Sequence, residues 1–315
     1  AIRKIIITYM SERKTIYLCL AHMSEAGLEQ KYVKEAFDTN WVVPMGPNVN
    51  AFEKDLENFV NSRAPLRLVQ SAEPETTVAA AEGESAPLRQ VPGGEPSRQE
   101  EPSRREESTN PSASPEKTTA EPLDRKVVCL SAGTAAVHLA LIGCGVKAGD
   151  EVLVQSYTFC ASSHPITYLG AHPVFVGSEG ETWNMDPALL EKAILDRKAK
   201  TGRYPKAIVP VALYGMPYRI DEILSIADRY GIPVVEDAAE GMGSRFNGQV
   251  LGTFGKYGVL SFNGNKMITT SGGGALICRN AEDANEIMWY ATQARDAYPY
   301  YQHTAIGYNY RMSNV

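Results

Sequence analysis

The sequence is poor in several features, and each shortage excludes a class of protein. Basic residues are outnumbered in the 315-residue chain, with 31 Lys and Arg against 37 Asp and Glu and a net charge of −6. A nucleic-acid-binding protein would show a basic stripe instead. No apolar run reaches the roughly 20 residues that a membrane-spanning helix needs. We therefore expect neither a nucleic acid nor a membrane as a partner.

Cysteine is also scarce. The five cysteines are scattered without a C-x-x-C pair, which argues against a structural zinc site, and the sequence predicts no bound metal. The apolar patch at residues 5–7 is too short for a signal peptide. Most of the cysteines lie in apolar runs, which predicts buried free thiols in a cytoplasmic protein. They are Cys19, Cys129, Cys144, Cys160 and Cys278.

Residues 62–124 differ sharply in composition from the rest of the chain. They contain no Phe, Trp, Tyr, Ile, Met or Cys, but they hold nine of the 19 prolines. Such a segment cannot bury enough apolar surface to offset the entropy lost on ordering. The composition predicts a disordered insert, either a tethered insertion or an artefact of the gene model. A docking segment is a further interpretation.

The residues before this insert show helical periodicity. Residues 1–15 are expected to be poorly ordered, and 16–61 to form an N-terminal helical segment. Apolar residues recur at helical spacing over 24–37 and 49–60, with Ser24 as the expected N-cap of the first helix. Two prolines and a glycine in residues 41–47 predict a loop between the helices.

Residues 125–315 alternate apolar strands with helices, which predicts an α/β fold. The expected architecture has three layers, α/β/α, around a mostly parallel sheet buried on both faces. Ligands bind such sheets at the carboxyl ends of the strands. Strands are predicted at 127–130, 151–155, 173–176, 207–211, 233–236, 257–262 and 275–278. Helices are predicted at 135–142, 161–169 (interrupted by Pro165), 186–195, 220–230 and 281–294.

Four motifs lie at these strand ends. The turn 131–134 precedes a helix, and its N–H groups with the Thr134 hydroxyl suit a phosphate. It is also explained as an ordinary strand–helix turn, and no G-K-[ST] follows it. An aromatic at 156–159 can stack on a flat ring or belong to the core. Asp237 ends a strand, where a carboxylate needs a cation or donors, although it could equally cap a helix.

Lys266 follows the last of these strands, five residues after Ser261. Alone it would be read as a solvated surface lysine, but a lysine in a packed α/β domain can also form a Schiff base. In chain order, the four motifs describe a site for pyridoxal 5′-phosphate. The phosphate is held at a helix N-terminus, the ring is stacked, its nitrogen is paired with Asp237, and Lys266 takes the aldehyde.

The segment 126–315 resembles the DegT/DnrJ/EryC1/StrS family of sugar aminotransferases, which are fold-type I pyridoxal-phosphate enzymes. The resemblance rests on the motifs at 130–136, 149–152, 157–159, 236–239, 258–274 and 307–313, and residues 16–60 look like the family's N-terminal region. It implies a large cofactor-binding domain over 125–315. The family continues with a C-terminal small domain, and we expect this chain to lack it.

The resemblance also implies a role for each site residue. Lys266 would form the Schiff base and act as general base. Asp237 would pair with the ring nitrogen, and Phe159 would stack on the ring. Glu240 departs from the Gln or His that many members have near the ring's 3-hydroxyl. The phosphate would be held by Gly133, Thr134 and Ser261, and Asn309 would reach the phosphate of the neighbouring subunit in a homodimer.

The family moves an amino group from L-glutamate to a keto-sugar linked to a nucleotide, in polysaccharide or glycan biosynthesis. We expect the same reaction here. Two alternatives remain open. In the family's pyridoxamine-dependent sugar dehydratases the lysine is replaced, which Lys266 disfavours. A catalytically impaired remnant is favoured by the insert and by the expected absence of the small domain. A dinucleotide-binding oxidoreductase is disfavoured because no G-x-G-x-x-G follows a first strand.

Overall fold

The computed structural model of the chain describes residues 24–63 and 122–315. Predictions for residues 1–15, for 16–23 of the expected N-terminal helical segment and for 64–121 of the expected insert lie outside the described residues. Two residues assigned to the insert belong instead to the packed domain. Arg245 donates to the Ser62 hydroxyl at 2.8 Å, and Arg63 donates to the Gln249 side chain at 3.3 Å. The N-terminal segment therefore extends at least to Arg63.

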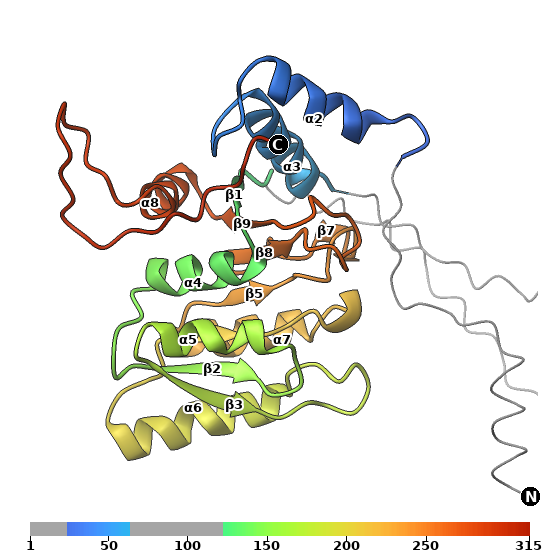
Figure 1. Cartoon of the computed structure of the whole chain (residues 1–315). Coiled ribbons are helices and arrows are strands. Elements are labelled where there is room, and N and C mark those ends of the chain that lie inside the picture. Colours follow the sequence, from blue (N-terminus) through green and yellow to red (C-terminus); the bar gives the residue numbers. More distant parts are fainter. Residues whose placement is uncertain (1–23, 64–121) are drawn as a thin grey trace, which may run out of the picture. The chain divides into compact units, whose positions relative to one another are not determined.

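The core of the domain is a mostly parallel sheet, as predicted (Figure 1). Its strands fall into two groups, β1-β9-β8-β5 and β3-β2-β4, which parallel bridges between β4 and β5 join. The antiparallel pairings in these groups are the two that β9 makes, with β1 and with β8, and the other pairings are parallel. The strands are β1 (Lys126–Leu130), β2 (Glu151–Gln155), β3 (His172–Val176), β4 (Ala207–Val209), β5 (Val235–Asp237), β8 (Tyr257–Ser261) and β9 (Gly274–Cys278).

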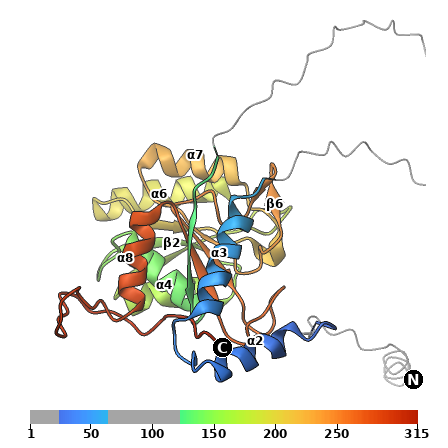
Figure 2. The same ribbon diagram turned by 90° about the horizontal axis from the view of Figure 1, so that it is seen from above.

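Helices pack on both faces of the sheet and complete the three layers. On one face lie α3 (Pro47–Asn61), α6 (Pro187–Thr201) and α7 (Ile220–Tyr230). On the other lie α4 (Gly133–Gly143), α5 (His164–Tyr168) and α8 (Ala281–Ala291). Figure 2 shows α3 running along β1. Successive side chains of a strand point to opposite faces of the sheet. Each strand therefore contributes apolar side chains to the core on both faces.

Most elements begin where local sequence signals place them. In α6, the Asp186 carboxylate accepts N–H groups of Ala188 and Leu189, and Pro187 occupies the first turn. The prediction for the first helix is wrong in one respect, because α2 (Leu28–Asp38) starts four residues after Ser24. Gly27, with φ of 64°, interrupts the helical path there, and Ser24 bonds the side chain of Glu29 instead.

Two local structures differ from the predicted elements. The helix expected over 161–169 is split into a 3₁₀ turn, η1 (Cys160–Ser162), and α5, with Pro165 in the first turn of α5. A short hairpin, β6 (Arg245–Phe246) and β7 (Gln249–Val250), was not predicted. Asn247 and Gly248 connect its strands, both with positive φ, as a type I′ turn requires.

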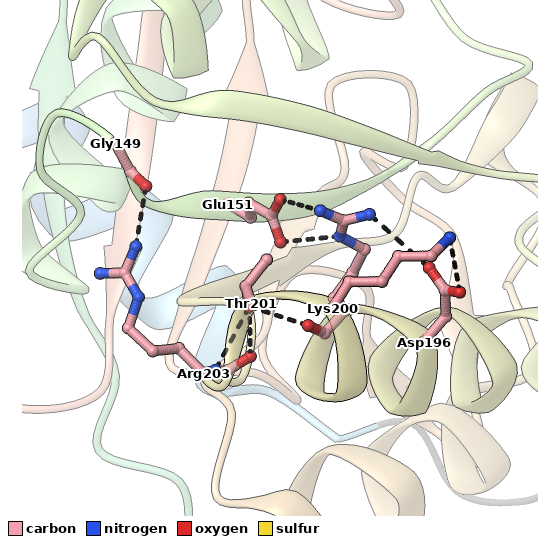
Figure 3. Close-up of polar contacts among 7 residues, drawn as sticks. Gly149, Glu151, Asp196, Lys200, Thr201 and Arg203 are labelled. Atoms are coloured by element: carbon pink, nitrogen blue, oxygen red, sulfur yellow. Dashed lines mark hydrogen bonds and ion pairs between the residues drawn. The ribbon is translucent and has the colours of Figure 1, made fainter.

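An ion-pair network ties the start of β2 to the end of α6 (Figure 3). Arg197 holds Glu151 through two hydrogen bonds of 2.9 and 2.6 Å, and Lys200 pairs with Asp196 at 2.8 Å. Arg203 donates to the Gly149 carbonyl at 3.2 Å. The network lies at the amino end of β2, so it fixes the sheet from the end opposite the strands' carboxyl ends.

Candidate active site

A cavity of about 670 Å³ opens at the carboxyl ends of the central strands. Turns that follow β1, β2, β5 and β8 line it, and so do residues between β8 and β9. Seven of the eight predicted site residues lie in this lining: Gly133, Thr134, Phe159, Asp237, Glu240, Ser261 and Lys266. The parallel strand order places these residues together although 133 positions separate the first from the last.

One wall of the cavity is the N-terminus of α4. Its N-cap, Ala132, provides no side-chain cap, so first-turn N–H groups of the helix have no acceptor within it. Gly133 lies against Ser261, because a Cβ on Gly133 would approach the Ser261 Cβ to 3.1 Å. The helix N-terminus, the Thr134 hydroxyl and the Ser261 hydroxyl therefore line one side of the cavity, which is suited to an anion.

Lys266 lies in the loop between β8 and β9. The loop is closed on Phe262, which donates its N–H to the Gly273 carbonyl and accepts the Thr270 N–H at 3.0 Å. Gly274 allows the following strand to pass close to the turn before α4, since a Cβ there would lie 2.4 Å from backbone atoms of Ala132 and Gly133. The side chain of Lys266 is only 16% exposed. Lys266 is therefore not the solvated surface lysine that its local sequence alone would indicate.

Glu240 is the direct partner of Lys266. Its Oε1 lies 3.3 Å from the Lys266 Nζ, and its Oε2 accepts the Tyr214 N–H at 2.7 Å. Tyr214 has a left-handed backbone, with φ of 51°. The carboxylate thus connects the lysine to the loop that follows β4.

Asp237 lies at the end of β5, buried, with a side chain held on both oxygens. Oδ2 accepts the Ser162 hydroxyl at 2.6 Å, and Oδ1 accepts the Ala239 N–H at 3.2 Å. Burial raises the pKa of Asp237 above its ordinary value, while the Ser162 hydrogen bond and the Lys266 charge act in the opposite direction. A cationic group placed in the cavity would favour the ionised carboxylate.

Aromatic side chains surround the mouth of the cavity. Phe159, Tyr157 and Tyr214 belong to the lining and are 74%, 49% and 75% exposed. Trp183 packs against Tyr157, with ring centroids 5.5 Å apart. The predicted stacking residue, Phe159, therefore has a free face.

Asn309 does not join the cavity. It is exposed, bridges to Thr292 and accepts the Gln293 side-chain amide at 3.2 Å. Its predicted role, contact with the neighbouring subunit's phosphate, stays a prediction.

Three residues at the site were not predicted as site residues from the sequence. Ser162 was assigned to the first turn of the helix predicted over 161–169, but it ends a 3₁₀ turn and its hydroxyl donates to Asp237. Thr158 extends this chain, with its hydroxyl 2.8 Å from that of Ser162. Tyr214 gave no signal at all, because its position depends on a hydrogen bond to a carboxylate 26 residues away.

These residues fit pyridoxal phosphate. The open N-terminus of α4 matches its phosphate, the buried carboxylate of Asp237 its ring nitrogen, and the shielded Lys266 its aldehyde. Phe159 would flank the ring. Among the described residues, no group of three or more His, Cys, Asp or Glu side chains is placed to hold a metal ion.

Solved structures share this fold. A DegT DnrJ EryC1 StrS aminotransferase from Brucella abortus superposes with a TM-score of 0.68 at 24% identity, covering 93% of this chain and 64% of that one. The putative sugar aminotransferase Spr1654 from Streptococcus pneumoniae, in its PLP form, gives 0.67 at 23% identity, covering 96% and 64%. The chain has the α/β fold of the fold-type I pyridoxal-phosphate enzymes, as predicted.

Sequence comparison defines the family. The profile of the DegT/DnrJ/EryC1/StrS aminotransferase family matches residues 116–315, and the chain belongs to that family. A putative pyridoxal phosphate-dependent aminotransferase, EpsN, from Bacillus subtilis is 41% identical over 302 residues, or 96% of this chain. GDP-perosamine synthase from Escherichia coli O157:H7 is 40% identical over 186 residues, or 59% of this chain. The predicted class, transferases that use pyridoxal phosphate, is confirmed at the level of the family.

These relatives are longer than the region they share with the chain. The alignments cover 61% of EpsN and 49% of the perosamine synthase. Two further relatives are named as aminotransferases of UDP-linked keto-sugars, and about half of each is covered.

Proposed function

We propose that this protein transfers an amino group from L-glutamate to a keto-sugar linked to a nucleotide. The observation that carries the proposal is the meeting of Lys266, Asp237 and the N-terminus of α4 in one cavity. Relatives named for GDP- and UDP-linked sugars support the class of acceptor. The link to polysaccharide or glycan biosynthesis and the cytoplasmic location remain predictions from the family resemblance and from the free cysteines.

Pyridoxal phosphate, when bound, would supply the electron sink that lets an amino group leave one carbon and join another. The chain's own residues would hold and serve it. Gly133, Thr134 and Ser261 would bind the phosphate, and Asp237, oriented by Ser162, would hold the ring nitrogen. Lys266 would carry the proton between the substrate carbon and the cofactor.

Glu240 would hold Lys266 near the reacting atoms, since it is the residue that contacts the Nζ group. A contact between Glu240 and the ring's 3-hydroxyl is a separate expectation from the resemblance. The presence of a lysine favours transamination over the dehydratase reaction, in which the residue at this position is replaced.

A homodimer would complete the site. The exposed position of Asn309, outside the cavity of its own chain, is consistent with a contact to the neighbouring subunit. In the predicted arrangement its amide reaches the partner's phosphate site.

The test uses the purified chain and absorbance spectroscopy. Added pyridoxal phosphate should give a visible band from capture by Lys266, and L-glutamate should convert it to the pyridoxamine form. Lys266→Ala should lose both the band and turnover, with an unchanged circular dichroism spectrum as the control for folding. A variant that kept its activity would overturn the assignment of Lys266. A wild-type chain without a band would favour a catalytically impaired remnant.

A further inference from the structure

An exposed tryptophan beside the cavity is held in an unfavourable backbone conformation. Trp183 has φ of 65°, in the left-handed region that bulky residues avoid, and its side chain is 58% exposed. Neither conformational preference nor burial of apolar surface explains an indole at this position. Strained residues of this kind collect at ligand-binding sites, where the surrounding structure enforces them.

The loop 178–185 is built to enforce this conformation. A bridge joins Ser178 to Met185, and the Glu179 N–H donates to the Asn184 carbonyl at 2.9 Å. The Glu179 carboxylate also accepts the N–H groups of Glu181 and Thr182, at 2.6 and 3.0 Å. The loop is therefore closed at its base and across its turn.

Two fully buried amide side chains connect the loop to the cavity walls. Asn184 accepts the Leu213 N–H at 3.0 Å and donates to the Met216 carbonyl at 3.1 Å. Gln155 accepts the Met185 N–H at 2.8 Å and donates to the Tyr157 carbonyl at 2.9 Å. Both side chains have 0% exposure, so the loop and the end of β2 form one rigid unit.

This unit places Trp183 against Tyr157, which itself lines the cavity. The two rings are 5.5 Å apart at 52° and leave an exposed face beside the cavity mouth. Trp183 is not part of the lining. A ligand that reached it would extend outward from the group bound near Lys266.

We propose that Trp183 and Tyr157 form a stacking platform for the nucleobase of the acceptor. This inference rests on the proposed function, because the acceptor's reacting sugar would lie in the cavity. In a sugar linked to a nucleotide, the flat π surface is the base, at the end farthest from the reacting carbon. Base stacking on an aromatic side chain contributes roughly 1–3 kcal/mol.

The test compares nucleoside diphosphates with inorganic pyrophosphate. Calorimetry on the pyridoxal-phosphate-loaded chain should show that UDP or GDP binds more tightly than pyrophosphate. Trp183→Gly should weaken the binding of UDP or GDP roughly 5- to 150-fold. It should leave the binding of pyrophosphate unchanged. Trp183→Phe should retain most of the affinity. The matched control is Tyr204→Ala, an exposed tyrosine outside the cavity lining.

The substitution Trp183→Gly also distinguishes a binding role of the indole from a structural one. Glycine adopts positive φ without strain, so Trp183→Gly should keep or raise the Tm while nucleoside binding falls. A lower Tm, or a change of oligomeric state, would show that the indole supports the fold or an interface and would overturn the proposal. So would unchanged UDP and GDP affinity. Conversion of the bound cofactor by L-glutamate needs no nucleotide, and it tests the proposed function separately.

Discussion

The Nζ of Lys266 lies 3.3 Å from Oε1 of Glu240, and the other oxygen of the same carboxylate binds the Tyr214 N–H at 2.7 Å. The lysine and the glutamate are 16% and 33% exposed. The candidate Schiff-base lysine is therefore paired with an anion that is also anchored to the backbone of a neighbouring loop. The contact with Glu240 must open before the Lys266 amine can reach an aldehyde in the cavity.

Replacing Glu240 by Gln should free the Lys266 amine from its partner. The amide keeps an acceptor for the Tyr214 N–H but removes the ion pair that holds the Nζ group. The visible band with pyridoxal phosphate should form about two- to fivefold faster, because a partly exposed ion pair contributes up to about 1 kcal/mol. Stopped-flow absorbance measures this rate.

Glu181→Gln serves as the matched control, since Glu181 pairs with Arg219 outside the cavity. It should leave the rate of band formation unchanged. An unchanged rate for Glu240→Gln would mean that the ion pair has no influence on Lys266.

Asp237 should make stability depend on pH. Burial raises the pKa of Asp237, so the folded chain holds this proton at pH values where the unfolded chain has released it. The contribution of Asp237 to stability therefore falls as pH rises from the ordinary value of Asp, about 3.9, through the raised folded value. Each unit between the two values corresponds to about 1.4 kcal/mol.

Ser162→Ala should enlarge this fall and extend it to higher pH, because it removes a hydrogen bond that lowers the pKa of Asp237. Asp237→Asn should abolish it. Urea unfolding of the cofactor-free chain from pH 4 to 8 provides the comparison. Parallel curves for the wild type and Asp237→Asn would contradict the assigned cause. Added pyridoxal phosphate should reduce the slope in the wild type by giving the carboxylate a cationic partner.

Removing one member of the buried pair between Glu53 and Arg311 should strongly destabilise the fold. Arg311 binds both carboxylate oxygens, at 2.5 and 3.0 Å, and also the Cys129 carbonyl at 2.8 Å. The two side chains are only 15% and 7% exposed. Removing one partner leaves the other charge buried, so Arg311→Ala should destabilise the chain by about 3–5 kcal/mol.

Guanidinium unfolding measures this effect. The exposed pair of Lys34 and Asp38 is the control, and Asp38→Asn should change stability by less than about 0.5 kcal/mol. A loss from Arg311→Ala no larger than that of the control would show that the pair is not desolvated. The double variant Glu53→Gln, Arg311→Met should lose less than the sum of the single changes.

Structural features that depend on only a few neighbouring residues could be predicted from the sequence. The bounds of β2 and α7 were predicted to the residue, because apolar periodicity and flanking turn residues define them locally. Asn247 and Gly248 carry the signal of a two-residue hairpin, and the unpredicted β6–β7 turn could have been found from it. No local pattern shows that Gly27 adopts a left-handed conformation, which is why the start of α2 was misplaced.

Membership in an aminotransferase family was also readable, since the order of four motifs at strand ends does not depend on seeing the fold. Lys266 illustrates the limit of that information. The sequence by itself determined which residue types follow each strand, and so that a lysine, a carboxylate and a helix N-terminus are available for pyridoxal phosphate. Only the tertiary structure decided their contacts: Lys266 to Glu240, Asp237 to Ser162, and Trp183 to Tyr157. Each of these pairs joins segments that sheet order, rather than chain order, brings together.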